Sequence, residues 1–126
     1  MKRYCFKTDK FKTIKDEDEN TNPGVYGLEL SKWIEKELKI LGYAVEEIIS
    51  EDWGWCVICK YKPFLLWVGC QGEYINEQLV WCCFAEAEKP IFRNPFKKLD
   101  IQESLEKLNK DLFQLLNKNF YLDEQI

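Results

Sequence analysis

Hydrophobic and polar residues alternate over the first positions of the chain. On one side of this two-residue period are Lys2, Tyr4 and Phe6, and on the other are Arg3, Cys5 and Lys7. Such alternation is typical of a β-strand. We therefore expect a short strand over residues 2–8. Its charges favour the edge of a sheet, where they oppose pairing with other molecules.

A different spacing follows and predicts a helix. Its apolar residues recur at intervals of four, four and three, at Leu30, Ile34, Leu38 and Leu41, which places them on one helix face. Asn22-Pro23 suits the helix start, and Gly42 suits its end. The acidic residues 16–19 lie just upstream, where they would interact from solvent with the positive end of the helix dipole. The alternative is an acidic patch for a partner.

Four segments rich in β-branched and aromatic residues predict further strands, at 43–49, 53–61, 64–70 and 79–86. Lys62-Pro63 provides a tight turn, and Gln71-Gly72 opens a longer one. Because these links are short, we expect an antiparallel meander. Asp100 and Glu103 have the spacing of a capping box, which predicts a last helix running to about residue 117.

The element order β-α-β-β-β-β-α predicts an α+β fold, a two-layer sandwich in which an antiparallel sheet of four to five strands carries both helices on one face. The other face should then be polar, but the strand patterns are apolar on both sides. Within 53–61, one side carries Trp53, Trp55, Val57, Cys59 and Tyr61, and the other Cys56 and Ile58. We expect self-association or residues 87–99 to cover the second face, with a ligand groove as the alternative.

Length and composition are those of one globular domain spanning residues 1–126. Hydrophobic residues make up 46% of the chain and charged residues 32%. No apolar run approaches the roughly 20 residues of a membrane span, and no apolar stretch resembling a secretory signal follows the basic N-terminus. We therefore expect a cytoplasmic protein without a membrane partner. The net charge of −4 argues against nucleic acid as a partner.

The chain has no histidine. This excludes Ser-His and Cys-His nucleophilic machinery, His-ligated zinc and the commonest general base near neutral pH. An enzyme built from this chain would depend on carboxylates, Lys, Tyr or Cys.

The six cysteines are expected to be reduced thiols packed as small hydrophobic side chains. The segment WCVICK, residues 55–60, resembles the Trp-Cys-x-x-Cys-Lys motif of thioredoxins, which implies a nucleophilic Cys56 and a resolving Cys59. On a strand, however, residues three apart point to opposite faces, so without a bulge these sulfurs can neither bridge nor share a metal. Cys82 and Cys83 are divided in the same way. We expect neither a metal nor a cofactor.

The candidate binding residues are two carboxylates between the strands predicted at 43–49 and 53–61, and four tryptophans. The carboxylates of Glu51 and Asp52 could act in acid–base chemistry, or could serve as ordinary turn residues. The tryptophans could line a pocket between sheet and helices or pack in the core; these are Trp53, Trp55, Trp67 and Trp81. The basic, aromatic residues 89–98 could contact an anionic partner or anchor a crossover.

Several motifs together resemble a group of short bacterial proteins without assigned activity. They are residues 22–27, NPGVYG, with Trp33 in the following helix, residues 51–55, EDWGW, and residues 66–70, LWVGC. The resemblance covers about residues 20–85 and implies a bacterial, cytosolic, stand-alone domain.

Two hypotheses for function follow. The first is a non-enzymatic interaction protein, accessory, immunity-like or regulatory, that uses an apolar aromatic sheet face to bind another protein or to form a homodimer. The second is a small-molecule binder or minor enzyme with a Trp-lined pocket and the carboxylate of Glu51 or Asp52 as its polar group.

Overall fold

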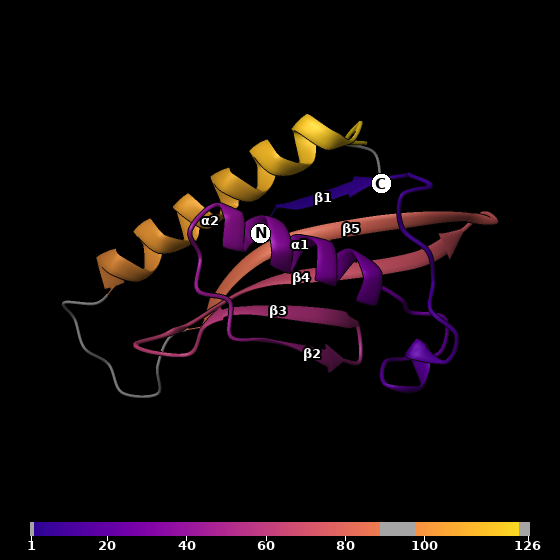
Figure 1. Cartoon of the computed structure of the whole chain (residues 1–126), viewed down its shortest axis with the longest axis horizontal. Helices are drawn as coiled ribbons and strands as arrows, with labels where there is room; N and C mark the ends of the chain where they lie inside the picture. The colour runs from indigo at the N-terminus through magenta and orange to yellow at the C-terminus, as the bar shows by residue number, and fades with distance from the viewer. Residues whose placement is uncertain (1, 89–97, 124–126) are drawn as a thin grey trace.

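Five strands form one antiparallel sheet, and the computed structural model describes residues 2–88 and 98–123 of the chain. Across the sheet the order is β1-β5-β4-β3-β2 (Figure 1). The strands are β1 (Arg3–Phe6), β2 (Glu47–Glu51), β3 (Gly54–Lys60), β4 (Leu65–Ile75) and β5 (Gln78–Glu88). The described helices are the 3-10 helix η1 (Glu17–Glu19) and the α-helices α1 (Leu28–Ile40) and α2 (Lys98–Asn119).

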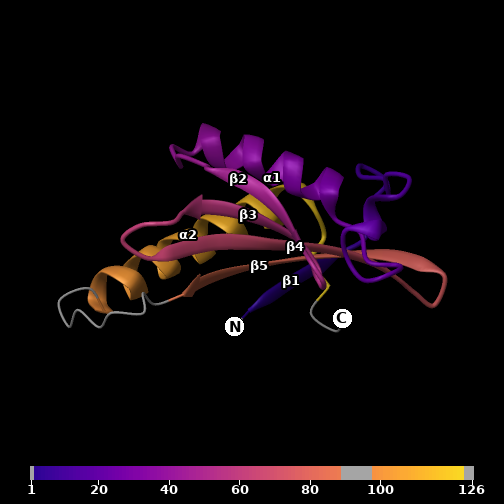
Figure 2. The ribbon, with the colours of Figure 1, turned by 90° about the horizontal axis from the view of Figure 1, so that it is seen from below.

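Both α-helices pack on the same face of the sheet. Their buried side chains belong to one cluster with Val57, Val68 and Trp81 from the three inner strands. α1 contacts β3 and β4, and α2 contacts β5; Figure 2 shows α1 lying along one side of the twisted sheet. The predicted fold class, element order and helix placement are confirmed. No described helix has both the length and the apolar character needed to cross a membrane.

Helix α1 begins five residues later than the sequence predicts. Asn22 and Val25 close a turn, in which the Val25 N–H donates to the Asn22 carbonyl over 3.0 Å. Gly24 at φ 82° and Gly27 at φ 145° have non-helical backbones, so Gly27, and not Asn22, is the N-cap. The apolar stripe is otherwise confirmed up to Leu38, whereas Leu41 is exposed. Helix α2 begins at Lys98, which places Asp100 in the first turn and not at the cap.

The β4–β5 hairpin is longer than predicted. Strand β4 continues to Ile75, and the hairpin closes through Asn76 and Glu77, at φ 50° and 67°, in a two-residue turn. The prediction that Gln71-Gly72 opens this turn was wrong. Gly72 lies inside β4, where the Trp81 ring fills the space that a side chain would need. A Cβ at this position would lie 2.6 Å from that ring.

Candidate functional site

The sheet has a second apolar face, on the side opposite the helices, which we call the outer face. Its side chains form two clusters separate from the helix-side core. The first contains Cys56, Ile58, Trp67 and Phe84, with Ile49, Trp53 and Leu65 packed against them, and the second contains Cys5, Val80 and Cys82. No residue of a described α-helix belongs to either cluster. The prediction of a sheet with two apolar faces is therefore confirmed.

Three aromatic rings form the centre of the outer face. Trp53 stacks on Trp67 with ring centres 5.5 Å apart and planes inclined by 27°. Phe84 contacts both, at 5.2 Å from Trp53 and 5.6 Å from Trp67. Ring pairs at these distances contribute about 0.5–1.5 kcal/mol beyond the area they bury. Trp67 and Phe84 are only 9% and 8% exposed, so the trio is a packed cluster in which Trp53 is the partly exposed ring.

Gly69 on β4 makes room for this trio. A Cβ at Gly69 would lie 2.4 Å from the Phe84 ring, so the ring rests directly on the glycine backbone. Register pairs Gly69 with Phe84 on β5 and with Cys56 on β3. The absence of a side chain at one position therefore lets an aromatic ring from the neighbouring strand lie flat across the sheet.

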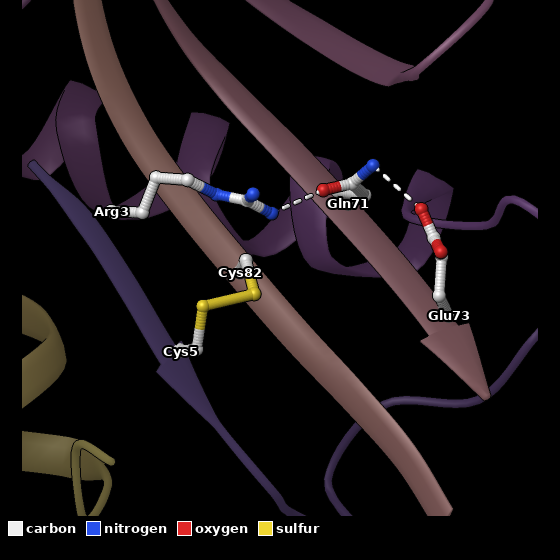
Figure 3. The surroundings of a disulfide bond; sticks show 5 residues. All are labelled: Arg3, Cys5, Gln71, Glu73 and Cys82. Carbon is white, nitrogen blue, oxygen red and sulfur yellow. Dashed lines mark hydrogen bonds between the residues drawn. A yellow bond between two sulfur atoms is a disulfide. The ribbon is translucent and has the colours of Figure 1, made fainter. Parts of the chain in front are cut away.

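A disulfide joins β1 to β5 in the second cluster of the outer face (Figure 3). Cys5 and Cys82 lie directly opposite in register, with Cα atoms 4.1 Å apart. The expectation that all six cysteines are reduced thiols is wrong for this pair. The sequence did not indicate it, because nothing local to residues 2–8 shows that this strand pairs with β5.

A polar group borders the disulfide. The Arg3 guanidinium donates to Gln71 Oε1 over 2.5 Å, and Gln71 Nε2 donates to Glu73 Oε1 over 2.8 Å (Figure 3). With Cys5 and Cys82, these side chains line a groove of about 210 Å³. The outer face therefore passes from apolar at its centre to polar toward β1.

The structure divides the four candidate tryptophans between the two faces. Trp53 and Trp67 lie on the outer face, whereas Trp81 is fully buried in the helix-side core. Trp55 also faces the helices. The prediction that Trp53 and Trp55 share a face is wrong, because Trp53 is a turn residue and Gly54, at φ 153°, interrupts the alternation. The four rings do not line one pocket.

Trp55 belongs to a buried carboxylate site that the sequence did not predict. Glu17, only 4% exposed, accepts hydrogen bonds from the Gly27 and Leu28 N–H groups at 2.8 and 3.0 Å, from Trp55 Nε1 at 3.2 Å and from the Ile14 N–H at 2.6 Å. The acidic run therefore does act on the start of α1, but through a buried side chain and not from solvent.

The two carboxylates predicted as candidate binding groups, Glu51 and Asp52, are exposed. Glu51 ends β2, and Asp52 begins the turn to β3, where its carbonyl accepts the Asn22 N–H over 2.8 Å. This bond joins the loop before α1 to the β2–β3 turn. Four grooves of about 210 to 670 Å³ are lined by described residues, and none of them is lined by Glu51, Asp52 or any of the four tryptophans.

The remaining cysteines are buried. Cys56 lies on the outer face and Cys59 in the helix-side core, as the strand geometry predicts. Burial raises the pKa of the Cys56 thiol to about 12, with a further contribution from the Glu51 charge. Burial likewise raises the pKa of Cys59 to about 12. Neither thiol has the low pKa of a thioredoxin nucleophile.

Native protein is therefore expected to react with a thiol reagent near neutral pH at least about a hundredfold more slowly than protein unfolded in urea. Without reductant, the unfolded chain should take four labels, on Cys56, Cys59, Cys70 and Cys83. Full reduction should raise the number to the six cysteines of the sequence. Rapid labelling of Cys56 in the native protein would contradict the buried-strand assignment.

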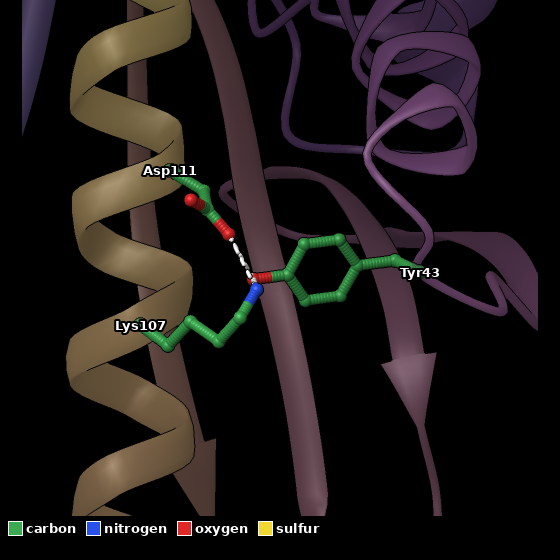
Figure 4. A network of polar contacts seen from close by, with 3 residues as sticks. All are labelled: Tyr43, Lys107 and Asp111. Carbon is green, nitrogen blue, oxygen red and sulfur yellow. Dashed lines mark hydrogen bonds and ion pairs between the residues drawn. The ribbon is translucent and has the colours of Figure 1, made fainter.

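A polar network joins the α1–β2 connection to α2 (Figure 4). Tyr43 donates to Asp111 Oδ2 over 2.6 Å, and Lys107 lies 2.9 Å from the same oxygen. Burial and the bond to Asp111 raise the pKa of Tyr43 to about 12. Strand β2 begins at Glu47 and not at Tyr43 as predicted, and the Glu46 N–H just before it donates to the Ile58 carbonyl over 2.8 Å. We assign the network a structural role.

Among residues 2–88 and 98–123, no three Cys, Asp or Glu side chains are grouped to hold a metal ion.

Comparison with protein-family models, curated proteins and solved structures found no match. The resemblance to short bacterial proteins therefore stays a prediction. Two further expectations, that residues 87–99 cover the second face and that residues 89–98 meet an anionic partner, fall largely on residues 89–97, outside the described residues.

Proposed function

We propose that this protein is a non-enzymatic interaction module, with an accessory, immunity-like or regulatory role in the bacterial cytoplasm, and that its outer face binds another protein molecule. The observation that carries the proposal is the trio of Trp53, Trp67 and Phe84 on the sheet face away from the helices. Aromatic side chains are the enriched anchors of protein interfaces, and apolar patches edged by charged residues are typical of them.

The composition of the edge supports the same proposal. Arg3 on β1 and Glu47 and Glu51 on β2 are exposed at opposite edges of the sheet. An apolar cluster between two charged edges resembles the arrangement of core and rim in protein–protein contacts. The competing hypothesis of a Trp-lined small-molecule pocket has less support, since Trp55 and Trp81 lie on the helix side and Trp53 and Trp67 on the outer side.

A site-specific photo-cross-linker tests this proposal. One variant carries the cross-linker at Glu86, which pairs with Trp67 in register and shares the outer face. The matched control carries it at Lys36, an exposed position on α1. After irradiation in cells that produce the protein, we expect a discrete protein adduct from position 86 and none from position 36. No protein adduct from position 86, or the same adduct from both positions, would count against the outer face as the binding surface.

A further inference from the structure

We propose that Cys70 and Cys83 are the site of a second disulfide, which closes when the chain folds in the presence of a disulfide oxidant. The two thiols lie on the helix side of the sheet, whereas the Cys5–Cys82 bond lies on the outer face. With both bonds, β5 is joined covalently to each of its neighbours, β1 and β4. The inference goes beyond the proposed function and does not depend on it, because neither thiol belongs to the outer face.

The two cysteine pairs have equivalent places in the strand register. Cys83 on β5 lies directly opposite Cys70 on β4, and the preceding residue, Cys82, lies directly opposite Cys5 on β1. Successive residues of a strand point to opposite faces. The side chains of each pair therefore share one face, the outer face for the first pair and the helix side for the second.

The bonded pair shows which kind of antiparallel position is used. In a non-hydrogen-bonded pair, the backbone N–H and C=O groups point away from the partner strand, and the Cα atoms lie about 4.5 Å apart. The Cys5 carbonyl accepts the Asp123 N–H over 2.8 Å. Because β1 is an edge strand, this bond points away from β5. Cys5 and Cys82 accordingly have Cα atoms 4.1 Å apart.

The backbone of Cys70 has the same orientation relative to β5. Two residues further along β4, Gly72 donates its N–H to the Tyr26 carbonyl over 2.7 Å and accepts the Tyr26 N–H over 2.8 Å. Gly72 faces Trp81 of β5 on its other side. The direction of hydrogen bonding repeats every two residues, so Cys70 and Cys83 also form a non-hydrogen-bonded pair. A separation of about 4.5 Å between Cα atoms falls within the range of disulfides.

Access from solvent distinguishes the two pairs. Cys70 and Cys83 are both 0% exposed, and their thiols are hydrogen-bonded to each other. Burial and this hydrogen bond raise the pKa of Cys70, so the folded protein holds little of the thiolate that exchange requires. Cys5 and Cys82, in contrast, line a groove that opens to solvent. The second bond therefore closes during folding, before the helices cover the sheet.

The other two free thiols do not compete for these partners. Cys56 lies on the outer face, opposite Gly69. Cys59 shares the helix side, but Trp55 is the β3 residue opposite Cys70. Cys59 lies four residues beyond Trp55, which is about 14 Å along an extended strand. Both are expected to stay thiols, and they provide an internal control.

Closure is a thiol–disulfide exchange with a small-molecule disulfide such as oxidised glutathione. One protein thiolate attacks a sulfur of the oxidant, forms a mixed disulfide and releases one glutathione thiolate. The second protein thiolate then displaces the remaining glutathione sulfur, which forms the bond between Cys70 and Cys83. Two protein thiols are oxidised, one glutathione disulfide is reduced to two thiols, and these take up the two protons. A reducing compartment keeps the pair as thiols.

Refolding in two buffers tests the inference. Reduced, urea-unfolded protein is refolded either with mixed oxidised and reduced glutathione or with reductant alone, then denatured and alkylated. After the glutathione buffer we expect two alkylated residues, Cys56 and Cys59, and after reductant all six cysteines. Cleavage after Lys and Glu separates Cys70 from Cys83, so mass spectrometry identifies the linked peptides. Circular dichroism confirms native refolding.

The variant Cys83→Ala is the matched control, because Cys82 and Cys83 lie on the same peptide. Refolded with glutathione, it should retain the link to Cys5 and carry Cys70 as a third alkylated residue. If this variant does not refold, Cys70→Ala replaces it, with Cys83 as the third alkylated residue.

A Cys70–Cys83 link in natively refolded wild-type protein, absent from the variant, supports the inference. Four or more alkylated cysteines in wild-type protein from the glutathione buffer overturn it. A glutathione adduct on either residue, or a link from Cys70 to any cysteine other than Cys83, also overturns it. The same holds if the bond occurs only in protein without the native circular dichroism spectrum.

Discussion

Replacing Glu17 by alanine is expected to lower the free energy of unfolding by about 3–5 kcal/mol. The carboxylate accepts four hydrogen bonds, three of them at one oxygen from Gly27, Leu28 and Trp55. Its removal leaves these donors without an acceptor in a site that water barely reaches, since Glu17 is 4% exposed. A buried donor without a partner costs about 1–3 kcal/mol, and the losses add to that of the cap on α1.

Urea unfolding followed by tryptophan fluorescence measures this effect. Glu19→Ala is the matched control, because Glu19 belongs to the same acidic run and is exposed; its effect should stay within about 0.5 kcal/mol. The loss of stability in Glu17→Gln should lie between the losses in Glu17→Ala and Glu19→Ala. The amide oxygen of Gln can still accept hydrogen bonds, whereas its NH₂ group would face the Ile14 N–H. Equal stability of the Glu17→Ala and Glu19→Ala variants would show that the buried carboxylate contributes nothing to the start of α1.

Replacing Gly54 by alanine is expected to destabilise the protein by a similar amount, about 3–5 kcal/mol, for a steric reason. Its φ of 153° is one that other residues rarely adopt, and a Cβ there would lie 2.5 Å from the Cys70 carbonyl oxygen. That oxygen belongs to the central strand β4 and cannot move away independently. A Cβ at Gly27 would lie 2.6 Å from the same carbonyl oxygen, so two glycines allow the β2–β3 turn and the start of α1 to approach one point of the sheet.

Gly42→Ala separates the contact from the backbone conformation. Gly42 also has a positive φ, 97°, but a Cβ there would meet nothing within 4 Å. Its replacement should cost only the conformational strain, about 1 kcal/mol. The difference between the two variants in thermal or urea unfolding measures the contact with Cys70. If the Gly54 variant is too unstable to purify, the yield of folded protein relative to the Gly42 variant gives the same ranking, and similar stability of the two would contradict the steric explanation.

Local periodicity predicted much of the fold correctly. The stripe of Leu30, Ile34 and Leu38 is fully buried, because a helix repeats its orientation every 3.6 residues whatever it packs against. Period-two alternation likewise separated Cys56 from Cys59 and Cys82 from Cys83. Element boundaries were less accurate where a tertiary contact competes with local preference, as at Tyr43, which is hydrogen-bonded to α2, and at Gly72, which lies beneath the Trp81 ring.

The sequence by itself determined the element types, the two apolar faces of the sheet and the absence of histidine chemistry, since each depends on residue identity or on spacing within one segment. Only the tertiary structure decided which segments far apart in the chain meet. It pairs β1 with β5 and thereby joins Cys5 to Cys82, brings Glu17 to the start of α1 and Trp55, and turns Trp53 onto Trp67 and Phe84. Such contacts depend on strand order and turn geometry, which no local pattern encodes. The disulfide, the buried carboxylate and the aromatic trio all have this origin.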